Sequence, residues 1–257
     1  MPPATTRLKD EPERPRLSRP ARVAEEIKDW IVQEHFSAGD RLPSEPDLIE
    51  RFGMAKGTIR EAMRILEAQG LVKSRTGPGG GTFVHEVSKE RARALLGNYF
   101  YFKDLTIKDI YQLRRVLEPE LAASLAGTLS DDVLEQLREI VGEYSEPAST
   151  IDEEREQHVA SLRFHALLAE QADNALLGFL IDFMVNMLSD LTVYRKLYEP
   201  PNVELWQRGA AFHLELIDAL RLGDADTARL VMRDHMETAQ KLMEGQEAEM
   251  QRRFITE

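Results

Sequence analysis

The chain has 257 residues, of which 42% are hydrophobic and 30% are charged, and its formal net charge is -12. That length is enough for one small domain and one larger domain, each with its own core. The chain contains no cysteine, which excludes a disulfide framework and thiolate chemistry and fits a reducing compartment.

The first element in chain order is a leader, residues 1–20, that is rich in proline and charge. It lacks the apolar segment of a signal peptide, and we expect it to be a disordered tail. We see no apolar run long enough to span a bilayer. The sequence therefore predicts a cytoplasmic protein without a membrane partner.

Residues 21–86 have the pattern of a winged helix-turn-helix. Val23, Ile27 and Trp30 form the apolar face of a first helix. Ser44 comes directly before EPDLIERF, and Asp47 three positions later allows a capping box at the start of a second helix. This pattern predicts a compact three-helix domain.

The third helix of this domain lies between two glycines, Gly53 and Gly70. Glycine at these positions favours the left-handed conformation that ends a helix and permits a tight turn. The stretches LV and TFV then flank GPGGG, which predicts a two-stranded wing whose glycines, including Gly80 and Gly81, let the backbone approach a phosphate or enter a minor groove.

Basic residues gather in this domain. Between Arg51 and His85 six Lys or Arg residues stand against two acidic residues, Glu61 and Glu67. Any one of the six could belong to an ordinary solvated face, but a basic island in an acidic chain attracts phosphate. We expect DNA contacts from Ser44, Lys56, Thr58, Arg60, Arg64, Lys73, Arg75, Gly80 and Gly81.

The segment from about Ala21 to His85 resembles the GntR-type bacterial regulators. LPSE, TIREAMRILEAQGLV and GGGTFV stand in the order and spacing of that family. The resemblance implies that Lys56, Thr58 and Arg60 contact a double-stranded operator. This chain has Pro46 and Lys56 where relatives usually have arginine, and Gly57 where a hydroxyl residue is common, so we expect its phosphate contacts and base choice to differ from theirs.

After a linker region at residues 87–104, residues 105–246 are rich in long amphipathic segments and show almost no strand pattern. Capping residues Thr106, Asp109 and Ser130 mark helix starts. The sequence predicts a mainly α protein, with the winged domain followed by a six- or seven-helix antiparallel bundle and a tail at residues 247–257. Residues 1–86 carry 14 basic and 14 acidic side chains, so the bundle and its flanks carry the whole negative charge and are not expected to bind DNA.

Three histidines of this region, His165, His213 and His235, fall on three expected helices with apolar neighbours. A lone histidine in such a place is usually a satisfied core residue. Three of them could instead converge on a divalent ion such as Zn or Ni, or hold a zinc-activated water in a hydrolase with Glu156 or Glu170 as the base. No HExxH motif supports the hydrolase interpretation.

LTIKDIYQLRRVLEPELAA, RFHALLAEQADN and FHLELIDALRLGDADTARLVMRDH resemble the ligand-sensing helical domain, the FCD domain, of FadR-type GntR regulators. The resemblance implies a metal held by three histidines and an aspartate. Here Ser161 stands four residues before His165, where the aspartate is expected, and a serine hydroxyl is a poor metal ligand. The ion would then be held weakly, or with water or effector oxygen, or the bundle would be only a metal-free dimerisation scaffold.

The resemblance also implies a small organic acid as effector, clamped by Arg114. Without the resemblance, Arg114 could equally form a surface pair with Glu118 at i+4. Asn174 and Arg195 are further candidates for the effector site, although Asn174 could simply cap its helix. We therefore expect a homodimeric transcriptional repressor that binds an inverted repeat in DNA. The effector is expected to change the affinity of the protein for this repeat.

Overall fold

The computed structural model describes residues 17–256, apart from residues 104, 195 and 200. It divides into two compact units, Met1–Ala92 and Arg93–Glu257. The expected disordered leader lies mostly outside the described residues. Its last residues are helical, because α1 begins at Arg19 and the hydroxyl of Ser18 accepts from the backbone N–H of Ala21.

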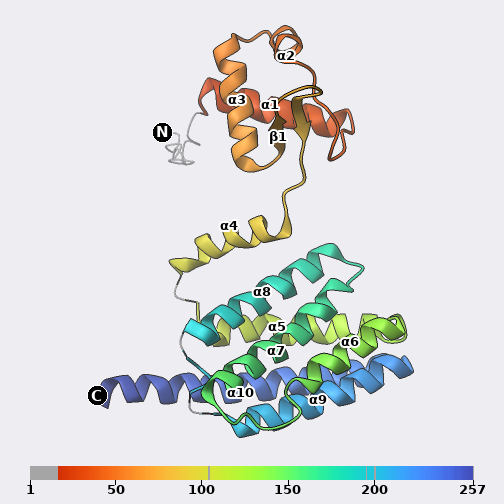
Figure 1. Cartoon of the computed structure of the whole chain (residues 1–257), viewed down its shortest axis with the longest axis vertical. Helices are drawn as coiled ribbons and strands as arrows, with labels where there is room; N and C mark the ends of the chain where they lie inside the picture. The colour runs from red at the N-terminus through yellow and green to blue at the C-terminus, as the bar shows by residue number, and fades with distance from the viewer. Residues whose placement is uncertain (1–16, 104, 195, 200, 257) are drawn as a thin grey trace, which may run out of the picture. The chain divides into compact units, whose positions relative to one another are not determined.

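Before α4, the described residues of the N-terminal unit form three helices and a hairpin (Figure 1). Its core is formed by α1 and α3, which pack against each other, with the shorter α2 across one end. Ile27, Ile59 and Leu66 are fully buried in this core, because apolar residues at helical spacing place one face of each helix inward. The elements are α1 (Arg19–Gln33), α2 (Glu45–Phe52), α3 (Lys56–Gln69), β1 (Val72–Arg75) and β2 (Gly81–Val84).

The start of α2 and the ends of α2 and α3 are built as the sequence predicts. The carboxylate of Asp47 accepts hydrogen bonds from the backbone N–H and the hydroxyl of Ser44, at 3.0 and 2.6 Å. Gly53 and Gly70 follow α2 and α3 with φ of 61° and 83°, the left-handed conformation that costs glycine little. The two helices therefore form a helix-turn-helix.

The wing is the antiparallel pair of β1 and β2, with Val72 opposite Val84 and Arg75 opposite Gly81. At its tip a Cβ atom on Gly80 would lie 2.6 Å from the carbonyl oxygen of Arg75, so only glycine fits there. Arg41 pairs with Phe83 beside the hairpin and donates to the carbonyl of Gly80 at 2.7 Å. The loop between α1 and α2 therefore holds the tip of the wing in place.

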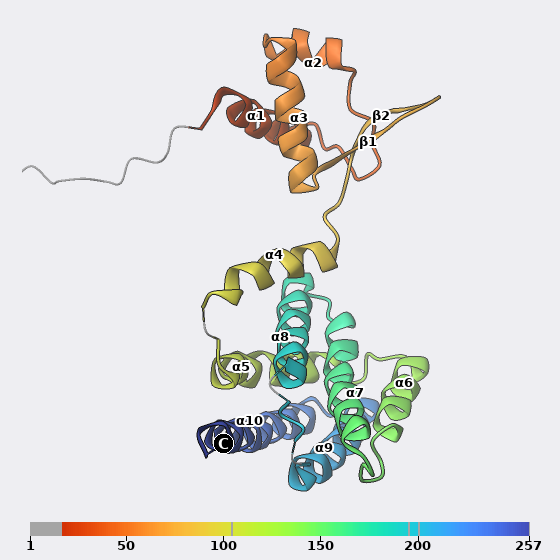
Figure 2. The same cartoon turned by 60° about the vertical axis from the view of Figure 1, so that its left-hand side comes forward.

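The C-terminal unit is helical throughout its described secondary structure, which confirms the mainly α fold class (Figure 2). In its core α5 packs against α10 and α8, α7 packs against α8, and α9 packs against α10. The helices are α4 (Lys89–Tyr101), which straddles the boundary between the units, α5 (Ile107–Leu125), α6 (Asp131–Gly142), α7 (Ile151–Glu170), α8 (Ala175–Tyr194), α9 (Val203–Leu222) and α10 (Ala225–Thr256).

Two features differ from expectation. Helix α10 continues to Thr256, where the sequence suggested an end near Gln246 and a tail. By length and composition α8 is apolar enough to cross a membrane over Ala175–Val193, although no such run was expected. This helix packs against α7 and α5, and 44% of the apolar run is buried inside the structure.

We expect Leu137→Ala to lower the free energy of unfolding of the C-terminal unit by about 2–5 kcal/mol, because Leu137 is fully buried in the bundle and its truncation leaves a cavity. Leu222→Ala is the matched control, since Leu222 is 80% exposed, and should change it by less than about 0.5 kcal/mol. Urea denaturation followed by circular dichroism measures both. Equal losses would contradict the assignment of the core.

Candidate DNA-binding surface and effector cavity

One face of α3 carries the basic side chains. Ile59, Ala62 and Leu66 point into the core, and consequently Lys56 and Arg60, which are one turn apart, lie on the opposite, solvent-exposed face. Thr58 is partly exposed at the first turn, and Arg64 is exposed one turn beyond Arg60. The second helix of the helix-turn-helix therefore presents a basic edge to a partner.

Acidic side chains occupy this edge in the free protein. Glu45, the last residue of the LPSE motif, pairs with Arg60 at 2.7 Å and with Lys56 at 3.4 Å. The hydrogen bond from Arg60 lowers the pKa of Glu45, so that the carboxylate stays charged. Exposed pairs of this kind contribute little to stability, and a DNA phosphate can replace Glu45 at low cost. Glu61 pairs with Arg64 in the same way.

The wing adds a second basic element. Lys73 and Arg75 are exposed on β1, and the Arg75 guanidinium lies over the Phe83 ring, 4.7 Å from its centroid. Gly80 and Gly81, at the tip of the wing, are partly buried. Ser44 is also exposed. Its hydroxyl donates to the carboxylate of Asp47, so in the free protein Ser44 caps α2.

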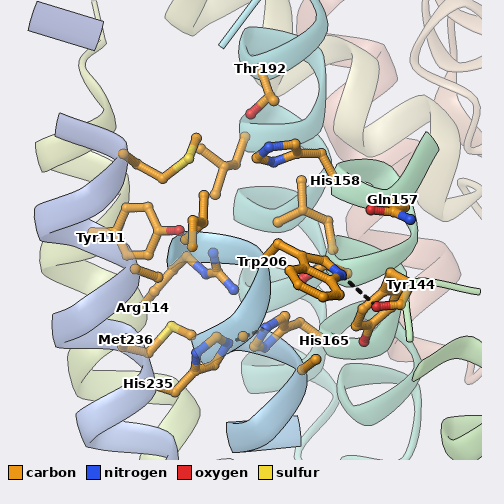
Figure 3. Close-up of a pocket in the computed structure, with 18 of the residues that line it drawn as sticks. Tyr111, Arg114, Tyr144, Gln157, His158, His165, Thr192, Trp206, His235 and Met236 are labelled. Atoms are coloured by element: carbon orange, nitrogen blue, oxygen red, sulfur yellow. Dashed lines mark hydrogen bonds between the residues drawn. The ribbon is translucent and has the colours of Figure 1, made fainter. Parts of the chain in front are cut away.

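The three histidines of the bundle converge. His165 from α7, His213 from α9 and His235 from α10 are all buried. The Nε2 atom of His165 lies 3.1 Å from Nε2 of His213 and 3.2 Å from Nε2 of His235. Figure 3 shows His165 and His235 facing each other at one end of a pocket.

The outer ring nitrogens of two of these histidines have oxygen neighbours. Nδ1 of His213 lies 2.8 Å from the Tyr144 hydroxyl. Nδ1 of His165 lies 2.6 Å from Oε2 of Glu118, although neither atom has hydrogen-bond geometry in this arrangement. If Nδ1 carries the proton in both His165 and His213, both Nε2 atoms have a free lone pair. The two lone pairs can then bind the same metal ion.

Burial sets the charge state of this cluster. Desolvation lowers the pKa of His165, and together with the neighbouring histidines it lowers those of His213 and His235 well below the ordinary value. Burial opposes the charged form of Glu118 as well, but the Arg114 guanidinium beside it lowers that pKa to about 2. The base of the pocket therefore holds neutral imidazoles next to a charged carboxylate and guanidinium.

Arg114 and Glu118 do pair at i+4, with Nε of Arg114 2.5 Å from Oε1 of Glu118. The pair is buried, each side chain being 1% exposed, and the sequence-based alternative of a surface pair is therefore wrong. The Nη2 atom of Arg114 is buried and has no hydrogen-bond partner. A buried guanidinium N–H without a partner, beside a cavity, can donate a hydrogen bond to a ligand that enters the cavity.

The cavity beside these groups has a volume of about 60 Å³, room for the centres of about four to six water-sized groups. It is lined by Arg114, Ser161, His165 and His235, and by apolar residues such as Leu162 and Leu188. Figure 3 shows the Arg114 guanidinium between Tyr111 and the histidines. Ser161 thus lies on the same lining as the histidines, one turn of α7 away from His165.

The donor set suits a metal ion. Tetrahedral zinc with bonds of about 2.0–2.1 Å to nitrogen requires nitrogen atoms about 3.3 Å apart, and two of the three Nε2 separations are 3.1 and 3.2 Å. All three ligand atoms lie within 4.8 Å of one another. Three imidazoles leave further coordination positions for oxygen from water or a ligand.

Other candidates lie elsewhere. Asn174 is exposed and caps α8, accepting from the backbone N–H groups of Leu176 and Leu177 at 3.1 Å each, so it does not line the cavity. Arg195 lies outside the described residues. Glu156 and Glu170, the general bases considered for a hydrolase, are exposed and absent from the described lining of the cavity.

Sequence reasoning gave no role at the site to several residues that the structure brings there. Glu118 was considered only as a partner for Arg114, and its contact with His165 depends on the packing of α5 against α7. The others share no pattern that periodicity could detect, because they come from the turn after α6 and from α7, α8 and α9. They are Tyr144, Gln157, His158, Thr192 and Trp206.

A basic helix-turn-helix with a wing, followed by a separate helical unit with buried histidines beside a cavity, defines a DNA-binding protein of two units. Comparison with known families agrees. Residues 20–84 match the model described as bacterial regulatory proteins, gntR family, and residues 109–238 match the FCD domain. The chain belongs to the GntR family of bacterial transcription regulators, with an FCD domain at its C-terminal side.

Relatives of known name are transcription regulators and not enzymes. They include the HTH-type transcriptional repressor NanR of Enterobacter sp. (strain 638), 27% identical over 83% of this chain and 81% of the relative, and the HTH-type transcriptional regulator LutR of Bacillus subtilis (strain 168), 25% identical over 84% and 96%. A solved structure titled Streptococcus agalactiae GntR shares the fold, with a TM-score of 0.61, 22% identity and coverage of 86% and 99%.

We expect Arg60→Ala to weaken binding to duplex DNA about tenfold or more, because one phosphate or base contact is lost. The slope of log K against log[salt] should also become shallower by about one. Lys28→Ala is the control, since Lys28 lies on α1 and pairs with Glu25 there. Fluorescence anisotropy with a duplex selected from a random pool measures both. Unchanged, salt-sensitive affinity in the Arg60 variant would rule out α3 as the recognition helix.

Proposed function

We propose that this protein is a transcriptional repressor whose affinity for its operator is controlled by a small carboxylate bound beside a metal ion in the bundle. One observation carries the proposal: three buried histidine Nε2 atoms converge at a cavity into which an unpartnered guanidinium N–H of Arg114 also faces. The sign of regulation is carried over from the relative named as a repressor, NanR.

The DNA-binding part of the proposal rests on the basic edge of α3 and on the wing. Lys56, Arg60 and Arg64 enter the major groove or its edges, while Lys73 and Arg75 approach the backbone. Glu45 is displaced from Lys56 and Arg60 when DNA binds. Thr58, Ser44, Gly80 and Gly81 contribute backbone or hydroxyl contacts at the ends of these elements.

The protein acts as a cytoplasmic homodimer on an inverted repeat, since two recognition helices one helical turn of DNA apart read two half-sites. Exposed apolar side chains on α5, Leu113 and Val116 at 54% and 64% exposure, support self-association of the bundle. Native mass spectrometry of the purified protein gives its stoichiometry directly.

In the metal part of the proposal, His165, His213 and His235 hold a divalent ion such as Zn or Ni through Nε2. The ion would supply Lewis acidity and open coordination positions. Glu118 replaces part of the negative charge that an aspartate at position 161 would provide, because its carboxylate lies against Nδ1 of His165. Tyr144 orients His213 in the same manner.

Arg114 then binds the effector carboxylate. Its Nε is held by Glu118, which fixes the guanidinium plane, and its free Nη2 is available to the ligand. Fork-shaped guanidinium donors match the two oxygens of a carboxylate. For the effector to change DNA affinity it must bind one arrangement of the bundle better than another, and that difference sets the size of the response.

Ser161 supports a second candidate, a regulator whose bundle binds no metal and serves only for dimerisation. Its neutral hydroxyl occupies the place where a charged ligand is expected. Absence of metal in the purified protein, together with no thermal shift across a panel of organic acids, would favour this alternative.

We expect elemental analysis of the purified protein to find close to one divalent ion per chain, and His213→Ala to lose it. Tyr144→Phe should keep the packing at this point but weaken metal affinity by about 10- to 100-fold, because it removes the hydroxyl that lies 2.8 Å from Nδ1 of His213. His158→Ala, a histidine of the same cavity outside the cluster, is the control and should retain the ion. Equal metal content in all variants would contradict the site.

We expect Arg114→Lys to abolish the thermal shift produced by small carboxylates while the protein remains folded. Lysine still offers a positive charge to Glu118 but lacks the planar fork. Arg115→Lys, on the exposed side of the same helix, is the matched control. An undiminished shift in the Arg114 variant would remove this arginine from the effector site.

A further inference from the structure

The wing has two faces, and its outer face is basic. Side chains alternate between the two faces of a strand. On β1, Val72 is buried in the core of the unit and Ser74 lines a groove beside α3, so these two residues mark the inner face. Lys73 and Arg75 therefore lie on the outer face, directed away from α3. Figure 2 shows the wing projecting beyond the helices of this unit.

A third basic residue reaches the outer face from the loop before α2. Arg41 forms an antiparallel bridge with Phe83, and Phe83 in turn lies opposite Lys73. Residues directly opposite one another in neighbouring strands share a face, so Arg41, Phe83 and Lys73 share the outer face. Leu42, the next residue along the chain, is buried in the core, as the alternation of side chains requires.

A glycine makes room for Arg41 near the tip of the wing. A Cβ atom on Gly81 would lie 2.7 Å from Nε of Arg41, so a larger residue there would displace the guanidinium. One N–H of Arg41 donates to the carbonyl of Gly80. Within the described residues its other N–H groups make no hydrogen bond, and the side chain is exposed. Most of the five donors of this guanidinium are therefore available to a further acceptor.

The absence of acidic partners distinguishes this face from the basic edge of α3. Each basic residue of that edge has a carboxylate partner. In contrast, no carboxylate in the part of the chain that the structure describes lies at ion-pair distance from Arg41, Lys73 or Arg75. Like charges opposite one another destabilise a sheet, and a bound phosphate would remove this repulsion without having to displace an acid.

The direction of the outer face decides which phosphates it can reach. We consider α3 in a major groove and the tip of the wing in the adjacent minor groove. The inner face of the wing, with Ser74 and Thr82, then lies toward the backbone strand that borders both grooves. The outer face lies toward the second backbone strand of the minor groove. That strand belongs to duplex outside the bases that α3 contacts.

We propose that Arg41, Lys73 and Arg75 form a second DNA contact surface, the outer wing surface, which binds backbone phosphates of the duplex that flanks the operator. It adds affinity without reading sequence, because phosphates are the same at every base pair. Arg41 also positions the tip of the wing through the carbonyl of Gly80. This inference rests on the DNA-binding part of the proposed function, since the wing reaches the flank only when α3 occupies the operator.

The test is fluorescence anisotropy on the full-length protein with duplexes that share one operator. The trimmed duplex holds only the bases that selection from a random pool keeps constant, and the extended duplex adds about ten base pairs, one helical turn, on each side. We expect the extended duplex to bind about tenfold more tightly. Scrambling the added sequence should change its affinity by less than about twofold, because the contacts are to phosphates.

Two variants assign this gain to the outer wing surface. Lys73→Gln removes one charge, and Arg41→Gln removes another while keeping an N–H donor for the carbonyl of Gly80. Each should weaken binding to the extended duplex about threefold to tenfold and make the slope of log K against log[salt] shallower by about one per chain. Each should leave binding to the trimmed duplex within about twofold.

The controls are Lys28→Gln, an equal change of charge on α1, and Arg60→Ala. The first should leave binding to both duplexes unchanged, and the second should weaken both. Thermal unfolding of each variant checks that it folds.

The outcomes separate this inference from the proposed function. If Arg60→Ala weakens binding but the added flanks, Lys73→Gln and Arg41→Gln change nothing, the outer wing surface is overturned and the proposed function stands. Equal losses on the trimmed and the extended duplex would place these charges within the operator and would also overturn the flank contact. If no duplex binds even at low salt, the proposed function fails and the outer wing surface fails with it.

Discussion

The buried ion pair of Arg114 and Glu118 is the constraint on which the site depends. A charge enclosed at 1% exposure must be paired, and pairing fixes both side chains at the base of the cavity. From there Glu118 reaches His165 while Arg114 keeps one N–H free toward the ligand space. One helix thereby organises both the histidine cluster and the proposed carboxylate clamp.

Charge is divided between the two units in a way that suits their roles. The N-terminal unit concentrates basic side chains on α3 and the wing, where Glu45 covers Lys56 and Arg60 with weak surface pairs that DNA can replace. The C-terminal unit carries the acidic excess on its surface and keeps its few functional charges inside. Attraction to phosphate is thus concentrated on one unit, and the proposed effector site lies in the other.

Local signals in the chain were enough for the helices and the winged unit. The capping residues Ser44, Thr106 and Ser130 and the glycines after α2 and α3 act over three or four residues, and the structure has the helix ends they predict. The end of α10 was predicted too early, because Gly245 stands directly before Gln246 and yet lies inside the helix, which continues to Thr256. Asn174 shows the limit of residue type as a guide, because an asparagine that caps a helix and one that binds a ligand look alike in sequence.

By itself the sequence determined which segments are helical, which face of α3 is basic, and which three histidines are candidate metal ligands. These features follow from the spacing of residues within single segments of the chain. Only tertiary structure decided that the three Nε2 atoms meet, that Glu118 lies against His165, and that Thr192 and Gln157 share a cavity with Arg114. These contacts join α5, α7, α8, α9 and α10. Their distances depend on how the helices pack together, which no single segment encodes.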